Sequence, residues 1–175
     1  MKDNKTLPSP CSVVKQNKMK QVQIFFLFLA AVCVSGSQVS KCKHGKDLSA
    51  NNEITLSNCE KPPCRLRRKT TVSIELKFKP EEDTKTLKNS VHAQILGLPF
   101  PFIGVDGNSI CDKIFDASTG AKASCPLKGG QEYVYKDSFK ILEIYPKIKV
   151  NVHWALKDDH DHDVLCFEVP ARITS

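Results

Sequence analysis

The chain has 175 residues, 26 lysines and arginines against 19 aspartates and glutamates, and a formal net charge of +7. This length fits one domain rather than two. The charge does not indicate nucleic-acid binding, because five of the lysines lie within the first 36 residues.

Residues 1–36 have the order of a secretory signal peptide with an upstream extension. Lysines precede an apolar run from Val22 to Val34, and small residues follow it. The run is too short to span a bilayer, which takes about 20 residues. Met19 is an alternative start. Cleavage after Gly36 would leave 139 residues with a net charge of +3, forming a single domain over residues 37–175. We therefore expect a secreted, extracellular protein.

Alternation of apolar and polar residues predicts β-strands along the mature chain. In chain order, the predicted strands cover 53–56, 72–78, 91–96, 132–135, 139–144, 148–156 and 165–171. Clusters rich in Pro, Gly, Asn and Asp separate them at 62–63, 80–83, 99–108, 129–130 and 158–163. About seven short strands are typical of an antiparallel β-sandwich. Residues 112–117 are expected to form at most a short helical turn.

The cysteines predict a disulfide-linked domain. Cleavage would remove Cys11 and Cys33 and leave six cysteines, an even number that indicates three disulfides in an oxidising compartment. Six cysteines allow fifteen connectivities. Spacing favours one local bridge, one bridge between the two chain ends and one across a polar loop, namely Cys59–Cys64, Cys42–Cys166 and Cys111–Cys125.

A series of short motifs covers almost the whole mature chain. In order, they are Cys59–Cys64 (CEKPPC), Leu98–Phe102 (LPFPF), Asp106–Gly107, Cys125–Leu127 (CPL), Glu132–Tyr135 (EYVY), Tyr145–Pro146, Val152–Leu156 (VHWAL) and Cys166–Pro170 (CFEVP). Together they resemble the ML (MD-two-related lipid-recognition) domain family over about residues 41–173. The resemblance implies an immunoglobulin-like β-sandwich whose incompletely filled interior accepts a sterol, and the same three disulfides.

The resemblance also implies which residues border the entrance to the interior. The positions that match the family's entrance residues are Phe102, Ile141 and Tyr145. Residues 98–103 are unusually apolar for a proline-rich segment, so they form either a plug for the core or the rim of a pocket, and the resemblance favours the rim. Phe100 adds a second large ring where the family often has a smaller aliphatic residue.

Four further residues are predicted to line the pocket: Tyr135, Trp154, Val91 and Ile95. Their alternative is ordinary core packing, because an inward tryptophan in a β-sandwich is often part of the core. The family resemblance allows both, since inward residues there can be core and pocket wall together.

Two polar segments have alternative interpretations. Residues 158–163 (DDHDHD) contain metal-ligand types, but six polar residues between two strands are what an exposed hairpin loop requires, so we expect no metal. The basic residues Arg65, Arg67, Arg68 and Lys69 form either a solvated edge or a surface that docks on anionic membrane.

The sequence favours a carrier over an enzyme. It has no nucleophile elbow, phosphate-binding loop or zinc-protease motif, so we expect no catalysis and no cofactor. We predict a monomer that binds a sterol or another apolar ligand and transfers it to a membrane or a membrane sterol acceptor, with no nucleic-acid partner. The alternatives are a carrier of fatty acids or semiochemicals and a receptor-accessory module that recognises lipids in innate immunity. The mature chain lacks an N-glycosylation sequon, so an extracellular fluid is at least as good an expectation as the endosomal or lysosomal lumen, which stays an alternative.

Overall fold

A computed structural model describes residues 37–43 and 53–175. The predicted signal peptide and its extension, residues 1–36, lie outside the described residues, so the cleavage remains a prediction. The described residues form eleven β-strands and no α-helix. They accordingly include no helix of the length and apolarity needed to cross a membrane.

The first sheet has six strands. Its order is β1 (Ser40–Lys41), β11 (Asp163–Thr174), β10 (Lys149–Lys157), β5 (Lys88–Ile95) and β6 (Leu98–Pro101), and β3 (Cys64–Arg67) also pairs with β11. All neighbours are antiparallel except β3, which runs parallel to the end of β11.

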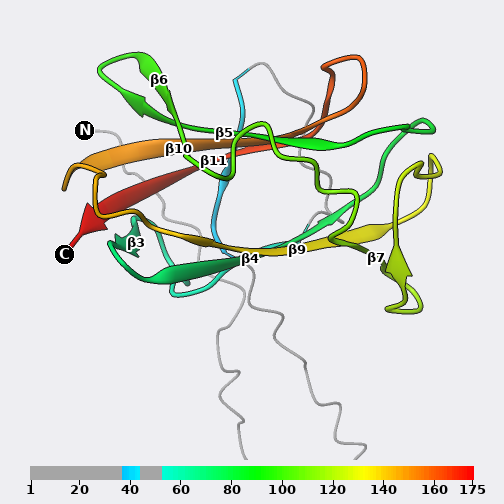
Figure 1. The fold of residues 1–175 in the computed structure, drawn as a ribbon, viewed down its shortest axis with the longest axis horizontal. Helices are drawn as coiled ribbons and strands as arrows, with labels where there is room; N and C mark the ends of the chain where they lie inside the picture. Colours follow the sequence, from blue (N-terminus) through cyan, green and yellow to red (C-terminus); the bar gives the residue numbers. More distant parts are fainter. Residues whose placement is uncertain (1–36, 44–52) are drawn as a thin grey trace, which may run out of the picture. The chain divides into compact units, whose positions relative to one another are not determined.

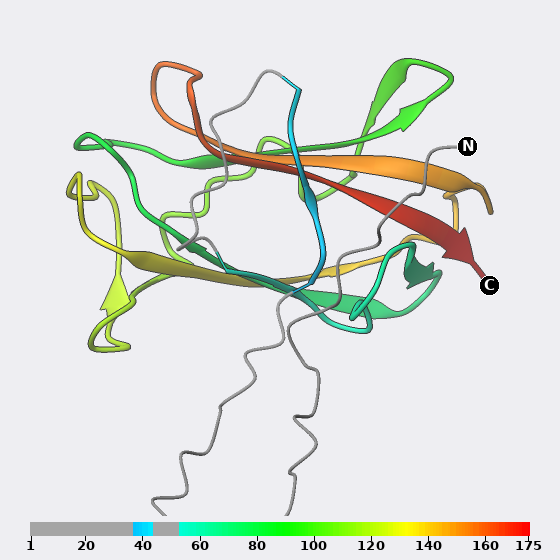
Figure 2. The same ribbon diagram turned by 180° about the vertical axis from the view of Figure 1, so that it is seen from behind.

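The second sheet is antiparallel throughout. Its order is β2 (Ile54–Leu56), β4 (Thr71–Phe78), β9 (Tyr133–Lys140), β7 (Ile114–Asp116) and β8 (Lys122–Ala123). The two sheets face each other as two layers, with β5, β10 and β11 on one side and β4 and β9 on the other (Figures 1 and 2). The predicted β-sandwich is confirmed.

The core lies between the two sheets because each long strand has one apolar face. Along β4, Val72, Ile74, Leu76 and Phe78 are buried, and the residues between them are exposed or partly exposed. From the other sheet, Trp154 and Phe167 stack with ring centroids 6.3 Å apart, and Phe139 of β9 lies 5.4 Å from Trp154. Aromatic rings from both sheets therefore meet at the centre of the sandwich.

Three disulfides join the cysteines in the pairing that the family resemblance implies. Cys42–Cys166 links residues separated by 124 positions, Cys111–Cys125 spans 14, and Cys59–Cys64 spans 5. The first connects the segment that follows β1 to β11, so it closes almost the whole domain into one loop.

The strand predictions need several corrections, and five of the eleven strands lie outside the predicted ranges, namely β1, β3, β6, β7 and β8. Strand β9 is continuous over Tyr133–Lys140, and residues 141–144 form a loop rather than a strand. The polar Asp137 does not end the strand because the Lys113 ammonium neutralises its carboxylate at 2.9 and 3.0 Å. Part of the predicted loop at 99–108 belongs to β6, and residues 112–117 contain β7 instead of a helical turn. β6 is an edge strand, where proline is tolerated because a missing N–H costs no ladder bond.

Candidate functional site

An apolar cavity lies at the end of the sandwich where β5 and β6 meet the β9–β10 loop. Its volume is about 570 Å³, within the range of small-molecule pockets. The lining side chains are almost wholly hydrocarbon, and the Tyr145 hydroxyl is their one polar group. They are Ala93, Ile95, Phe100, Pro101, Phe102, Ile103, Ile144, Tyr145, Pro146, Ile148 and Ile173. This chemistry suits an apolar ligand with a small polar group near solvent.

Large apolar side chains are exposed in the cavity lining and in the adjoining hairpin. Phe100, Ile103 and Ile144 of the lining are 48%, 59% and 78% exposed, and Leu96 and Leu98 of the β5–β6 hairpin are 100% and 61% exposed. Leu96 and Gly97 both have positive φ and form a two-residue turn between the strands. We call the five exposed residues the apolar rim, namely Leu96, Leu98, Phe100, Ile103 and Ile144. Exposed apolar groups of this kind mark interaction sites.

A second, much smaller void lies between the sheets. Its volume is about 20 Å³, and its walls include Val72, Phe139, Trp154 and Phe167. Phe102 lines both this void and the outer cavity. The Phe102 ring lies 6.3 Å from Phe139 and 5.5 Å from Tyr145. It is therefore the wall that separates the outer cavity from the interior.

The two sides of the cavity are joined through Tyr145. Its hydroxyl accepts a hydrogen bond of 2.9 Å from the backbone N–H of Ile103. Partial burial raises the pKa of Tyr145, so the hydroxyl stays neutral at physiological pH. The ring faces the cavity lining while the hydroxyl fastens the segment that follows β6.

The structure brings together some of the sequence-predicted site residues and separates others. Phe100, Phe102, Tyr145 and Ile95 share the outer cavity. Trp154 borders the inner void, while Ile141, Tyr135 and Val91 are fully buried and line neither of these two spaces. Pro101 and Ile103 lie in the segment 98–103, which the sequence already indicated as a candidate pocket rim. The sequence missed Ile144 and Pro146, which lie in a loop without alternation, and also Ala93, Ile148 and Ile173. The apolar character of Ile144, between Glu143 and the predicted entrance residue Tyr145, is the signal that could have found it.

A buried polar network holds Trp154 in the core. The amide of Asn89 accepts a hydrogen bond of 3.1 Å from the Trp154 indole N–H and donates one of 2.8 Å to the Tyr135 hydroxyl. Tyr135 donates in turn to Asp137 at 2.8 Å, and burial raises the Tyr135 pKa. The hydrogen-bonded network ends at Lys113, whose ammonium pairs with the Asp137 carboxylate. These groups satisfy one another, as buried polar groups must.

Two histidines stack on the outer face of the first sheet, beside a disulfide. His92 of β5 and His153 of β10 are register partners, with ring centroids 4.5 Å apart. Burial, followed by the neighbouring imidazole, lowers the pKa of His92. His153 also lies near both sulfurs of Cys42–Cys166, which are unavailable as metal ligands while bonded to each other.

The acidic loop at 158–163 uses its carboxylates within the turn. Asp158 accepts hydrogen bonds of 2.8 Å from the backbone N–H groups of His160 and His162. Asp161 pairs with Lys88 and Asp163 pairs with Lys157. These contacts match the predicted hairpin loop.

Comparison with known proteins identifies relatives over most of the chain. A family profile described as the ML domain matches residues 36–173. The NPC intracellular cholesterol transporter 2 homolog a of Drosophila melanogaster is 31% identical over 82% of this chain and 93% of its own length. The ecdysteroid-regulated 16 kDa protein of Manduca sexta is 30% identical over 86% and 99%. The crystal structure of a Niemann-Pick type C2 protein from Japanese carpenter ant superposes with a TM-score of 0.58 at 28% identity, covering 79% of this chain and 96% of the ant protein.

Proposed function

Because the chain belongs to the ML domain family, we propose that it is a secreted, non-enzymatic carrier that binds one lipid of the sterol class. The observation that carries this proposal is the outer cavity of about 570 Å³, whose lining has the Tyr145 hydroxyl as its one polar group. Burial of the ligand's apolar surface drives binding at roughly 25 cal/mol per Å². Relatives named as cholesterol transporters support a sterol over other lipids.

In the proposed mechanism, the ligand lies in the outer cavity and advances toward the interior past Phe102. The polar group of the sterol remains at the mouth near the Tyr145 hydroxyl. Ile141 supports this mouth from within the core, since it is fully buried at the start of the loop that carries Tyr145. No covalent step is needed, because transfer only requires the ligand to leave by the same mouth.

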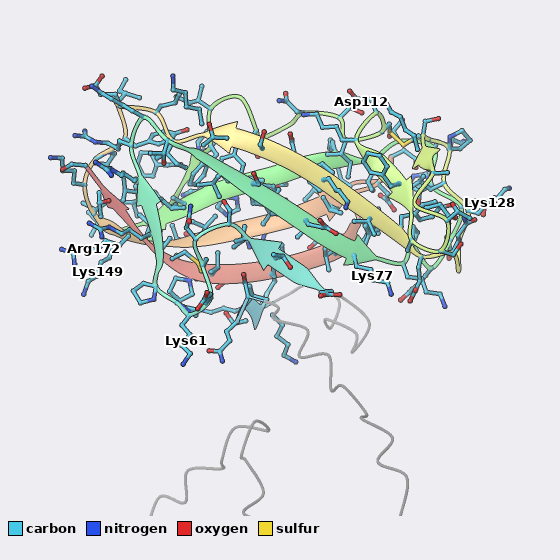
Figure 3. The ribbon with its side chains drawn as sticks, turned by 90° about the horizontal axis from the view of Figure 1, so that it is seen from below. Lys61, Lys77, Asp112, Lys128, Lys149 and Arg172 are labelled. Carbon is cyan, nitrogen blue, oxygen red and sulfur yellow. A yellow bond between two sulfur atoms is a disulfide. The ribbon has the colours of Figure 1, made fainter. Side chains whose placement is uncertain are left out.

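We further propose that the cavity end of the molecule docks on an anionic membrane or a membrane acceptor during transfer. The apolar rim supplies surface that can enter the headgroup region. Lys149 and Arg172 are register partners next to the cavity residues Ile148 and Ile173, and both are exposed. They lie at one end of the sandwich, opposite Lys77 and Lys128 (Figure 3). Each basic residue near an anionic surface contributes about 1 kcal/mol.

The binding proposal is tested by titrating the secreted protein with a fluorescent sterol, then displacing that probe with unlabelled cholesterol. We expect saturable binding of about one probe per chain. Phe102→Leu should weaken binding about fivefold or more, because the ring that borders both spaces loses contact area. The matched control is Phe78→Leu. Phe78 is as well buried as Phe102, but it is the last residue of β4, packs against Tyr133 and lines neither space.

Absence of saturable sterol binding would contradict the proposal. Saturable binding of a fluorescent fatty acid without sterol binding would instead indicate a fatty-acid carrier. Mass spectrometry of lipids extracted from the protein of its native source then names the ligand itself.

A further inference from the structure

The basic segment Arg65–Lys69 divides into two kinds of residue in the structure. Arg65 and Arg67 of β3 are exposed, whereas Arg68 is half-buried in the turn between β3 and β4. Lys69 has a φ of 68°, which belongs to the left-handed region and marks a tight turn. The turn lies against the β9–β10 loop, which carries cavity residues.

The side chain of Arg68 holds the backbone of that loop. Its Nη1 donates a hydrogen bond of 2.8 Å to the carbonyl of Glu143 and a longer one of 3.4 Å to the carbonyl of Tyr145. Hydrogen bonds from a guanidinium are stronger than those between neutral groups. The two accepting carbonyls flank Ile144, so Arg68 fixes the backbone from which Ile144 and Tyr145 reach the cavity.

Backbone contacts from the same turn fasten the start of the loop. The N–H of Lys69 donates to the carbonyl of Ile141 at 2.7 Å, and the N–H of Ile141 donates to the carbonyl of Thr70 at 2.9 Å. The Lys69 ammonium also lies 2.7 Å from the Glu143 carboxylate, but both side chains are 65% exposed, so this pair contributes little. The guanidinium of Arg68 is thus the main side-chain anchor.

Arg68 occupies this position although one of its guanidinium nitrogens makes no hydrogen bond there. Its Nε is buried and has no hydrogen-bond partner in the part of the chain that the structure describes. A buried donor without a partner costs free energy. The placement of the guanidinium is therefore determined by the loop carbonyls that Nη1 contacts.

The opposite wall of the cavity is attached to this loop by a single hydrogen bond. Within residues 53–175, the bond from Ile103 N–H to the Tyr145 hydroxyl is the one that joins residues 98–107 to residues 141–148. Gly104 and Gly107, with φ of 78° and 75°, follow Ile103 and give that side turn conformations suited to glycine. The two walls are held by different elements. The 98–103 wall is held by the pairing of β6 with β5 and by the Phe102 N–H, which donates to the carbonyl of Val91 at 2.9 Å. The 141–146 loop has no strand pairing and is held by the turn that carries Arg68.

We propose that Arg68 is a positioning residue that holds the 141–146 loop as a wall of the mouth and thereby slows ligand exchange. The part that concerns ligand exchange rests on the proposed carrier function. The part that concerns loop position does not depend on any ligand. It assigns Arg68 to the site and leaves Arg65 and Arg67 to the surface.

Hydrogen–deuterium exchange of the ligand-free secreted protein tests the loop directly. Three amides report on it, because those of Ile141, Tyr145 and Ile148 donate within or beside the loop. Arg68→Gln should accelerate their exchange at least tenfold, since the loop loses two charge-assisted hydrogen bonds. Arg65→Gln and Arg67→Gln carry the same charge change and should alter it less than twofold. Arg68→Lys, which keeps the charge but has a single nitrogen, should give an intermediate acceleration and serves if Arg68→Gln does not fold.

A second measurement uses a fluorescent sterol and vesicles of phosphatidylcholine with phosphatidylserine. The rate at which the probe dissociates into these vesicles should rise about fivefold in Arg68→Gln at every salt concentration. Arg65→Gln should change only how this dissociation rate depends on salt. Equal rates of amide hydrogen–deuterium exchange in Arg68→Gln, Arg65→Gln and Arg67→Gln would overturn the positioning role of Arg68. Failure of the parent protein to bind the probe would contradict the carrier function and leave the exchange result to decide the role of Arg68.

Discussion

Replacement of Asn89 by alanine should destabilise the domain by about 2 to 4 kcal/mol. Asn89 is 2% exposed and bonds both the Trp154 indole and the Tyr135 hydroxyl. In Asn89→Ala the indole N–H stays buried without a partner, which costs about 1 to 3 kcal/mol, and a further hydrogen bond worth about 1 kcal/mol disappears. Tyr135 keeps its bond to Asp137, so its hydroxyl remains satisfied.

Urea unfolding followed by far-UV circular dichroism and by tryptophan fluorescence measures this loss. Trp154 is the only tryptophan in the chain, so its emission reports on this network alone. The matched control is Asn151→Ala, because Asn151 is half-buried on the outer face and donates to Glu168 at 2.6 Å; its cost should stay below about 1 kcal/mol. Equal costs for the two variants would show that the buried network does not stabilise the core in the way the contacts indicate.

Three further outcomes are expected. Replacing both cysteines of the Cys42–Cys166 bridge by serine should cost about 5 kcal/mol in urea unfolding, against about 2 kcal/mol for the Cys59–Cys64 bridge, because the first closes a loop of 124 residues and the second one of 5. Gly129→Ala should lower stability by about 2 kcal/mol, since a Cβ there would lie 2.7 Å from the backbone of Glu82. The lowered pKa of His92 means that the unfolded chain binds more protons just below pH 6.5, so stability should fall as the pH drops through this range, and His92→Gln should flatten that part of the pH profile.

The sandwich was predictable because its long strands alternate over much of their length, as in β4 and in the first six residues of β10. The prediction failed where a polar residue faces inward and finds its partner far away in sequence. Asp137 interrupts the apparent pattern of β9, yet Lys113 from the segment before β7 neutralises it. A pattern of alternation cannot register such a partner. It likewise cannot tell an edge strand containing Pro99 and Pro101 from a loop, since only the tertiary position of β6 makes those prolines tolerable.

The candidate site was predictable only in part, for a related reason. Residues of one apolar segment, such as Phe100 and Phe102, stand out in the sequence and share the cavity in the structure. Arg68 looks like its neighbours Arg65 and Arg67 in sequence, and only the packing of two loops distinguishes them. Functional positions defined by contacts between segments distant in sequence therefore require the structure.

The interior volume determines how the proposed carrier would take up its ligand. The void between the sheets is about 20 Å³, room for about one water molecule and far less than a lipid needs. A lipid therefore reaches the interior only if side chains around Phe102 repack. Repacking exchanges contacts among Phe102, Phe139 and Trp154 for contacts with the ligand. Because both sets of contacts are apolar, the depth of insertion depends on shape rather than on polar recognition, and substitutions at Phe102 should change which ligands are accepted more than how polar they are.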